Sequence, residues 1–215
     1  MSYKVIVFDW DGTLYDSGAY IVACLQAASK EVGITVPSVA AIRNVIGLSF
    51  DEALKKLLPN VSSEQAKVFE KAYRFCISGS DIRKPVLFEG AEGVLQKLTT
   101  EGYWLAVATG KSRRGLDNDL ATLGIGKYFM TTRCADEAFS KPHPKMLLDI
   151  IDELGVDASK VLMIGDTEYD LGLAENAHVD ALAVDYGMHE RERLLKYKVK
   201  GCISDIRELP EWLVG

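Results

Sequence analysis

The segment V-I-V-F-D-W-D-G-T at residues 5–13 decides the fold, because a short apolar run leads directly into two aspartates, a glycine and a threonine. Lys4 and Asp9 flank the run, which is typical of a strand buried on both faces of a parallel sheet. Similar apolar runs recur at residues 104–108, 161–164 and 181–184. Helix-like stretches lie between them, at residues 90–100 and 144–154, and each ends near a glycine, as helices often do. This alternation predicts an α/β fold with a doubly wound, Rossmann-like parallel sheet.

Residues 16–84 interrupt the alternation. Their apolar side chains keep helical spacing, and no strand-like run separates them. The positions with this spacing are Ile21, Leu25, Ala28 and Val32, then Ala53, Leu54, Leu57 and Leu58, and then Ala66, Phe69, Tyr73 and Cys76. Pro85 restarts the α/β pattern. We therefore predict an α/β core domain made of residues 1–15 and 85–215, with an inserted helical-bundle cap made of residues 16–84.

The composition is that of an ordinary globular protein. The chain has 215 residues, of which 48% are apolar and 26% charged, and its formal net charge is −6. An acidic chain does not attract polyanions as a whole, so nucleic acid is not expected as a partner. No apolar run approaches the ~20 residues that cross a bilayer, and the first residues lack the layout of a signal peptide. These features predict a cytoplasmic protein with no membrane partner.

The cysteines predict neither a metal site nor a disulfide framework. Cys24, Cys76, Cys134 and Cys202 are spread along the chain without a C-x-x-C pair. A zinc knuckle or a dense disulfide scaffold has closer spacing. We expect buried free thiols in a reducing compartment.

Polar groups gather at the ends of the predicted strands and in one further loop. Asp9 and Asp11 follow the first strand, and the other groups lie in T-G-K at residues 109–111, S-K-P-H-P at 140–144 and G-D-T-E-Y-D at 165–170. The carboxyl ends of parallel strands face one crevice, so we expect these groups to meet there. Two unit charges ~4 Å apart repel by about 4 kcal/mol at an effective dielectric constant of 20. A divalent cation that prefers oxygen ligands, such as Mg²⁺, would offset this repulsion.

Four segments together resemble the motifs of the haloacid dehalogenase (HAD) superfamily. They are D-W-D-G-T-L-Y-D-S at residues 9–17, V-A-T-G-K at 107–111, S-K-P-H-P at 140–144 and I-G-D-T-E-Y-D at 164–170. Their order and spacing cover the whole chain, and within the superfamily the chain is most similar to the phosphoglycolate phosphatase-like branch with a small helical cap. The resemblance implies a Mg²⁺-dependent phosphatase. Such an enzyme hydrolyses a small phosphorylated metabolite, such as phosphoglycolate, through an aspartyl-phosphate.

The resemblance also implies a role for each residue that matches a motif. Asp9 matches the nucleophile that attacks phosphorus. Asp11 matches the general acid and base, which protonates the leaving oxygen and later activates water. Thr109 and Gly110 match the motif that binds the phosphoryl oxygens, and Lys141 matches the cation that balances Asp9 and the phosphate.

Mg²⁺ is the cofactor that the resemblance implies. Its protein ligands would be Asp9, the backbone carbonyl of Asp11, and Asp166, while Asp170 resembles the outer acidic residue that orients either the metal's shell or Lys141. The acid at position 11 favours phosphate chemistry over dehalogenation, because a halide leaving group needs no proton. The physical requirement agrees, since phosphoryl transfer depends on positioning and on charge compensation.

Several alternatives stay open on the sequence alone. A phosphosugar mutase of this superfamily usually carries a histidine shortly after the first motif, where this chain reads A-Y-I-V at residues 19–22. A pyrophosphatase fits the motifs, and a sugar phosphate or a nucleotide would suit them as well as phosphoglycolate. A phosphoacceptor receiver of the signalling class shares the strand-end carboxylates, but the helical insert and the G-D-T-E-Y-D segment do not fit it. Monomer and homodimer are equally compatible with the sequence.

The remaining polar residues receive weaker roles. Lys111, Arg113 and Arg114 surround the start of a predicted helix near residue 112, where a run of charges favours solvated surface; Lys111 is the first candidate for substrate contact. Trp10 is expected to pack against the sheet or the cap hinge. No catalytic role is expected for His143, His178 or His189.

The cap is expected to close over the crevice and expel water before transfer. Residues 16–18 and 84–85 are the predicted hinge, because they join the two predicted domains. The loop at residues 47–49 resembles the cap loop that touches substrate, although a simple turn between two cap helices would explain it equally well. Pocket shape sets the choice of substrate, and the sequence does not specify it.

Overall fold

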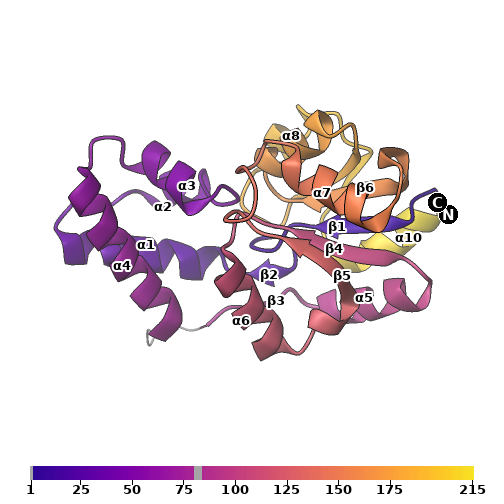
Figure 1. Ribbon diagram of the computed structural model, residues 1–215, viewed down its shortest axis with the longest axis horizontal. Coiled ribbons are helices and arrows are strands. Elements are labelled where there is room, and N and C mark those ends of the chain that lie inside the picture. Colours follow the sequence, from indigo (N-terminus) through magenta and orange to yellow (C-terminus); the bar gives the residue numbers. More distant parts are fainter. Residues whose placement is uncertain (1, 80–83) are drawn as a thin grey trace.

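The computed structural model describes residues 2–79 and 84–215. Within them, six parallel strands form one sheet in the order β5-β4-β1-β6-β7-β8. The strands are β1 (Val5–Phe8), β4 (Trp104–Ala108), β5 (Phe129–Arg133), β6 (Val161–Gly165), β7 (Asp180–Val184) and β8 (Gly201–Ile203). Helices cover both faces of the sheet (Figure 1). The predicted α/β fold class is confirmed.

The two edge strands were not predicted, and their sequences explain why. The edge strand β5 reads F-M-T-T-R and has mixed burial, so it lacks the continuous apolar run that marks the central strands. The other edge strand, β8, has only three residues. Edge strands need to bury less of their surface than central strands do, and short, polar edges also discourage pairing with other chains.

The central strand β1 divides its side chains between two cores. Ile6 and Phe8 join the cluster that contains α5 (Ala91–Thr100) and α10 (Leu209–Val214). Val5 and Val7 join the cluster on the other face, which contains side chains of α7 and α8. The helices of that face are α7 (Lys145–Leu154) and α8 (Glu168–Asn176). Because successive strand residues point to opposite faces, a strand that is buried on both sides must be apolar throughout.

The remaining elements of the core are short connections and one longer helix. Helix α6 (Arg113–Leu123) begins after β4, and α9 is a four-residue helix (Arg191–Leu194). Three 3₁₀ turns are η1 (Gly126–Tyr128), η2 (Ala158–Lys160) and η3 (Ile206–Glu208). None of the helices in residues 2–79 and 84–215 combines the length and apolar character needed to cross a bilayer.

The predicted helical insert forms a separate group of helices beside the sheet (Figure 1). They are α1 (Gly18–Val32), α2 (Val39–Arg43), α3 (Phe50–Leu57) and α4 (Ser63–Gly79). Their shared core includes Ile21, Leu25 and Phe69, which lie at positions with helical spacing. Helix α2 was not predicted, since it has only five residues. Residues 80–83 of the predicted cap lie outside the described residues.

A two-stranded ribbon connects this helical cap to the core. Strand β2 (Tyr15–Asp16) pairs antiparallel with β3 (Val86–Leu87). The domain boundaries expected from the sequence, at 15/16 and 84/85, fall within or beside this ribbon. Both chain crossings between core and cap therefore lie side by side, which is the geometry a hinge needs. Hinge motion at residues 16–18 and 84–85 stays a prediction.

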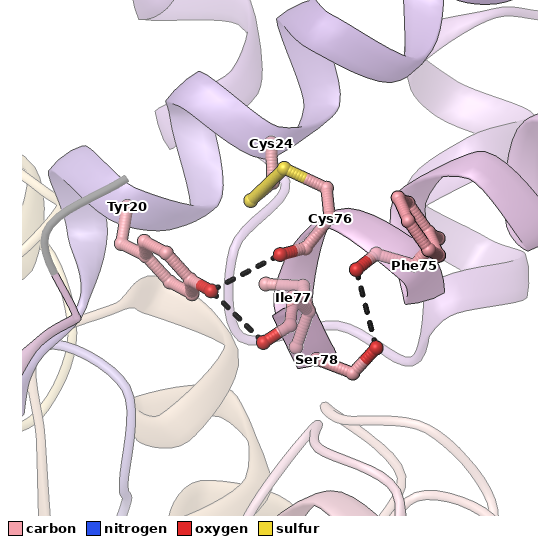
Figure 2. The surroundings of a disulfide bond; sticks show 6 residues. All are labelled: Tyr20, Cys24, Phe75, Cys76, Ile77 and Ser78. Carbon is pink, nitrogen blue, oxygen red and sulfur yellow. Dashed lines mark hydrogen bonds between the residues drawn. A yellow bond between two sulfur atoms is a disulfide. The ribbon is translucent and has the colours of Figure 1, made fainter. Parts of the chain in front are cut away.

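The cysteines contradict the expectation of free thiols at two of the four positions. Cys24 of α1 and Cys76 of α4 form a disulfide, with their Cα atoms 5.5 Å apart (Figure 2). The hydroxyl of Tyr20 donates to the carbonyl oxygens of Cys76 (3.2 Å) and Ile77 (2.9 Å) beside it. The spacing argument failed because helices far apart in sequence pack together in the cap. Cys134 and Cys202 are free.

Candidate active site

The predicted motif residues meet at the carboxyl ends of neighbouring strands. Asp9 follows β1, Thr109 follows β4 and Asp166 follows β6, and these three strands are adjacent in the sheet. Lys141 reaches the same place from the loop before α7. We call this group of strand ends, with Lys141, the active-site rim. The crevice expected from the topology is therefore where the charged residues lie.

Asp9 and Lys141 form a buried ion pair at the centre of the rim. The Lys141 Nζ lies 2.7 Å from Asp9 Oδ1 and 2.5 Å from Asp170 Oδ1, and all three side chains are almost fully buried. Burial opposes the charge on Lys141, but Asp170 and Asp9 outweigh it and hold the lysine pKa above its usual range. Asp170 thus contacts Lys141 directly, which was one of its two expected roles.

The Asp9 carboxylate has one oxygen in that ion pair and one without a partner. Among the described residues, no side-chain or backbone group bonds to the buried Oδ2 atom. The pKa of Asp9 is raised well above its ordinary value, first by burial and then by the charge of Asp170, while Lys141 lowers it. A buried oxygen with no protein partner costs free energy, so this atom is suited to an added cation or to reaction.

Asp166 is held by two donors that the motif analysis did not identify. The Thr13 hydroxyl donates to Oδ1 at 2.8 Å, and the backbone N–H of Met188 donates to Oδ2 at 2.8 Å. Burial and the neighbouring Asp170 raise the pKa of Asp166 to about 7. Gly12 leaves the space this carboxylate needs, since a Cβ there would lie 2.2 Å from Oδ2.

The buried carboxylates fit a divalent metal. Oxygens of Asp9, Asp166 and Asp170 lie within 4.8 Å of one another. Asp170 is already engaged, because its Oδ2 accepts from the backbone N–H (3.0 Å) and hydroxyl (2.7 Å) of Thr167 in a capping box of α8. The unpartnered oxygen of Asp9 and the carboxylate of Asp166 are therefore the best placed to bind a hard cation such as Mg²⁺.

Asp11 lies next to the other rim carboxylates but has different neighbours. The hydroxyl of Ser17 donates to its Oδ1 at 2.7 Å, and the Lys111 Nζ lies 3.3 Å from the same atom. Gly12 has a φ of 97°, a value that glycine adopts readily, and the chain turns directly after Asp11. The turn leaves the Asp11 side chain lining the cavity together with Asp9.

Thr109 and Gly110 line the same cavity at the end of β4. The Thr109 hydroxyl accepts from the backbone N–H of Lys111 at 3.1 Å. Helix α6 begins as expected, with Ser112 as its N-cap. Gly110 has no room for a side chain, because an added Cβ would lie 2.5 Å from the carbonyl oxygens of Gly47 and Leu48 in the cap.

The three cations after β4 separate into different environments. Lys111 is 17% exposed and lies 3.3 Å from Asp11 and 3.2 Å from Asp119, so the expectation of solvated surface is wrong for it. Burial opposes its charge, but the two carboxylates raise the lysine pKa above its usual range. Arg113 points away, to Glu137, whereas Arg114 is exposed and lines the cavity.

Two aromatic residues outside the expected site also have defined contacts. Trp10 is fully buried, packs against Tyr15 and Phe129, and donates from Nε1 to Asp119 Oδ2 at 3.0 Å. His189, for which no catalytic role was expected, is a buried loop residue whose Nδ1 accepts from the backbone N–H of Glu168 at 3.1 Å. Burial, with Arg193 nearby, lowers the pKa of His189 to about 4, so this ring is neutral.

The cap contacts the core beside the rim through the end of α2 and the loop that follows it. The Arg43 guanidinium donates to the carbonyl of Gly187 at 2.6 Å, and the Tyr169 hydroxyl donates to the carbonyl of Asn44 at 2.7 Å. The backbone N–H of Ser49 donates to the Ser140 hydroxyl at 2.9 Å. The loop at residues 47–49 is therefore more than a turn between cap helices, since it forms part of the contact with the core.

A cavity of about 600 Å³ lies between the rim and the cap. Asp9, Asp11 and Thr109 line its core side, and α1, α3 and α4 supply the cap side with mainly apolar residues. Enclosed spaces of this size, apolar with a few converging polar groups, are typical of sites for small molecules. The charged rim and the cavity therefore form one site.

Comparison with known proteins gives the family. The family described as Haloacid dehalogenase-like hydrolase matches residues 6–184. The Probable phosphatase IndB of Dickeya dadantii is 32% identical over 194 residues, covering 88% of this chain and 84% of that protein. A Phosphoglycolate phosphatase of Colwellia psychrerythraea is 27% identical over 218 residues, covering 96% and 95%.

A solved structure agrees with this result at the level of the fold. The crystal structure of a predicted phosphoglycolate phosphatase from Haemophilus somnus has a TM-score of 0.91 to this chain at 22% identity, covering 99% of each. The family match spans most of the chain and contains the whole active-site rim. The protein therefore belongs to the haloacid dehalogenase-like hydrolase family, the superfamily that its four motifs resemble.

Proposed function

We propose that the protein is a Mg²⁺-dependent phosphatase that hydrolyses a phosphomonoester of a small metabolite through an aspartyl-phosphate on Asp9. Membership of the hydrolase family supports hydrolysis, and relatives named as phosphatases support phosphate as the group removed. The single observation that carries the proposal is the state of Asp9. Its carboxylate faces the cavity with one oxygen paired to Lys141 and the other without a partner.

In the first half of the reaction, the Asp9 carboxylate attacks phosphorus and the bond from phosphorus to the ester oxygen breaks. Asp11, which lines the same cavity, gives its proton to the departing oxygen. Thr109 and the backbone at Gly110 bind the phosphoryl oxygens, and Lys141 balances the charge that gathers there. Fixed donors and cations of this kind lower the barrier because they need no reorganisation during the reaction.

In the second half, Asp11 accepts a proton from a water molecule as that water attacks phosphorus. The bond between phosphorus and the Asp9 oxygen breaks, and inorganic phosphate and the free carboxylate are formed. Ser17 and Lys111 hold the Asp11 carboxylate in place at 2.7 and 3.3 Å. The cap closes the cavity above it, which keeps other water away from the first step.

Mg²⁺ would be held by Asp9, the backbone carbonyl of Asp11, and Asp166. Thr13 and the N–H of Met188 orient Asp166, while Asp170 orients Lys141. Bound there, the cation supplies charge neutralisation for the phosphate and the carboxylates that face it. Outer contacts of this kind orient the ligands of a metal site and tune its affinity.

The alternatives are weaker. A receiver module is not supported, because the family match includes the helical cap. A pyrophosphatase or a phosphosugar mutase would use the same rim. The mutase has no support from the cap residues that follow the first motif, where residues 19–22 contain no histidine. Monomer or homodimer, and a cytoplasmic location, stay predictions.

Turnover of p-nitrophenyl phosphate tests the proposal. We expect many turnovers per molecule with Mg²⁺ and none after chelation with EDTA. Asp9→Asn should lower kcat by about 10⁴-fold or more, with an unchanged circular dichroism spectrum. Borohydride reduction during turnover should convert position 9 to homoserine, detectable by mass spectrometry. Full activity of Asp9→Asn, or a single turnover only, would overturn the proposal.

A further inference from the structure

The cavity has a distinctive ion cluster where the leaving group would lie. The Lys111 ammonium lies between two carboxylates, 3.3 Å from Asp11 and 3.2 Å from Asp119. Trp10 fixes Asp119 from behind with a 3.0 Å hydrogen bond. Lys111, Asp11 and Asp119 are 17%, 11% and 14% exposed, so water screens them only weakly.

This cluster leaves no buried cation free for a substrate. Asp11 carries a proton when it acts as the acid, and Asp119 then matches the ammonium of Lys111 at 3.2 Å. The proposed reaction places Asp11 beside the ester oxygen, so a carboxylate one or two bonds from that oxygen would lie against the cluster. That carboxylate would lie near Asp119 with no free cation to pair with, and an unpaired buried charge disfavours a ligand strongly. The other lining cations, Arg74, Lys84 and Arg114, are exposed to solvent and are therefore more strongly screened.

The cap side of the cavity favours a large, neutral and apolar leaving group. Its lining includes Ile21, Leu54, Phe69 and Tyr73, which come from α1, α3 and α4. The cavity volume of about 600 Å³ falls within the ~300–1,000 Å³ of pockets that enclose drug-sized molecules. A two-carbon leaving group would leave this apolar surface uncovered, whereas a larger neutral one would bury it.

We infer that the substrate is the phosphomonoester of a neutral, partly apolar alcohol, and that Asp119 excludes leaving groups that carry a carboxylate. This inference rests on the proposed phosphatase function and narrows it. Hydroxyl groups of such an alcohol can bond to Lys111 and Asp119, and its apolar part fills the cap side. Phosphoglycolate, which relatives are named for, is then a poor substrate of this protein.

Matched substrates test the charge and the size separately. 2-Hydroxyethyl phosphate and phosphoglycolate differ by a hydroxymethyl group in place of a carboxylate, and benzyl phosphate adds an apolar ring. We expect kcat/KM for 2-hydroxyethyl phosphate to exceed that for phosphoglycolate about tenfold or more, equivalent to ~1.4 kcal/mol. The kcat/KM for benzyl phosphate should in turn exceed that for 2-hydroxyethyl phosphate.

A variant of Asp119 tests whether this residue excludes leaving groups that carry a carboxylate. Asp119→Asn keeps an oxygen that can accept from Trp10 but removes one negative charge. It should therefore reduce severalfold the ratio of kcat/KM for 2-hydroxyethyl phosphate to kcat/KM for phosphoglycolate. Asp117→Asn makes the same charge change on the same helix, at a side chain that is 59% exposed and pairs with Arg113. This control should leave the ratio unchanged. A ratio cancels any general loss of activity in either variant.

The outcomes separate this inference from the function it rests on. If the wild type has a kcat/KM for phosphoglycolate equal to or above that for 2-hydroxyethyl phosphate, this inference is overturned, while the proposed phosphatase function still stands. An unchanged ratio in Asp119→Asn would overturn the role of Asp119. No Mg²⁺-dependent turnover with any substrate, p-nitrophenyl phosphate included, would overturn the proposed function and the inference together.

Discussion

The two sides of the cavity are built by different physical means. On the core side, each buried charge has a specific partner, as with Lys141 between Asp9 and Asp170. On the cap side, apolar side chains such as Leu54 and Phe69 pack without fixed partners. Polar networks require fixed geometry, whereas apolar walls tolerate exchange of residues at similar volume. We therefore expect the core side to set the chemistry and the apolar cap side to select the size of the leaving group.

Removal of the central cation should give the largest effect. Lys141→Met would leave Asp9 and Asp170 buried without their shared partner, so we expect a loss of about 3–5 kcal/mol in the free energy of unfolding. The kcat should fall by ~10²–10³-fold or more. Thermal unfolding and p-nitrophenyl phosphate assays measure the two effects. Lys145→Met is the matched control, because the exposed ion pair of Lys145 with Asp149 contributes little to stability. A wild-type kcat in Lys141→Met would contradict the view that the core side sets the chemistry.

A methyl group at the contact between the two sides should give the next largest effect. Gly110→Ala places a Cβ 2.5 Å from two cap carbonyl oxygens, so the cap loop must withdraw. We expect kcat/KM to fall by ~10–100-fold with little change in the melting temperature. Gly93→Ala is the control, since a Cβ there meets nothing within 4 Å. Equal kinetics of the two variants would show that the closed cap is not needed for turnover.

The carboxylates of the core side predict an effect of pH on metal-free stability. Asp166 in the folded protein has a pKa raised from 3.8 to about 7, so without Mg²⁺ the folded state keeps a proton that the unfolded chain has lost. Stability should therefore fall as the pH rises from about 4 to about 7. Mg²⁺ at ~100 times its dissociation constant should raise the melting temperature by roughly 5–10 °C at pH 8. Mg²⁺ should raise the melting temperature less at pH 5, because Asp166 is then protonated. NaCl of equal ionic strength is the control, and equal shifts of the melting temperature at both pH values would contradict the metal site.

The disulfide of the cap should affect stability while leaving the chemistry almost unchanged. It closes a loop with a sequence separation of 52, and replacing Cys24 and Cys76 by Ala should cost about 2–4 kcal/mol. Differential scanning calorimetry measures the loss. We expect kcat for p-nitrophenyl phosphate to stay within about twofold of wild type, because the core side is untouched. Dithiothreitol should destabilise the wild type but not the double variant; the same response in both would contradict this assignment.

The sequence predicted best those features that a strong local pattern specifies. The continuous apolar run before Asp9 predicted β1, and the four motifs predicted which residues meet at the rim. The edge strand β5 was missed because F-M-T-T-R has only two apolar residues and so lacks a continuous apolar run. The five-residue helix α2 was missed for a related reason, since it is too short to show a period.

Contacts between distant segments could not be predicted from one sequence. Asp119 lies in the middle of α6 and resembles an exposed helix residue until the fold brings Trp10 and Lys111 beside it. Thr13 and Met188 hold Asp166 from separate parts of the chain. The pairing of Cys24 with Cys76 likewise depends on how α1 packs against α4. Packing of this kind follows from the complete tertiary structure and from no local motif.

The disulfide also has a mechanical consequence. Both termini lie at the end of the core far from the cap (Figure 1), and the cap is inserted in the chain between them. A force that pulls the two termini apart is transmitted along the chain and therefore through the cap. The Cys24–Cys76 disulfide carries this force directly between the two cysteines, so the residues between them are not stretched. The bypassed residues would otherwise release roughly 170–190 Å of contour length. Under load, most of the cap is thus spared the stretching that unravels the rest of the molecule.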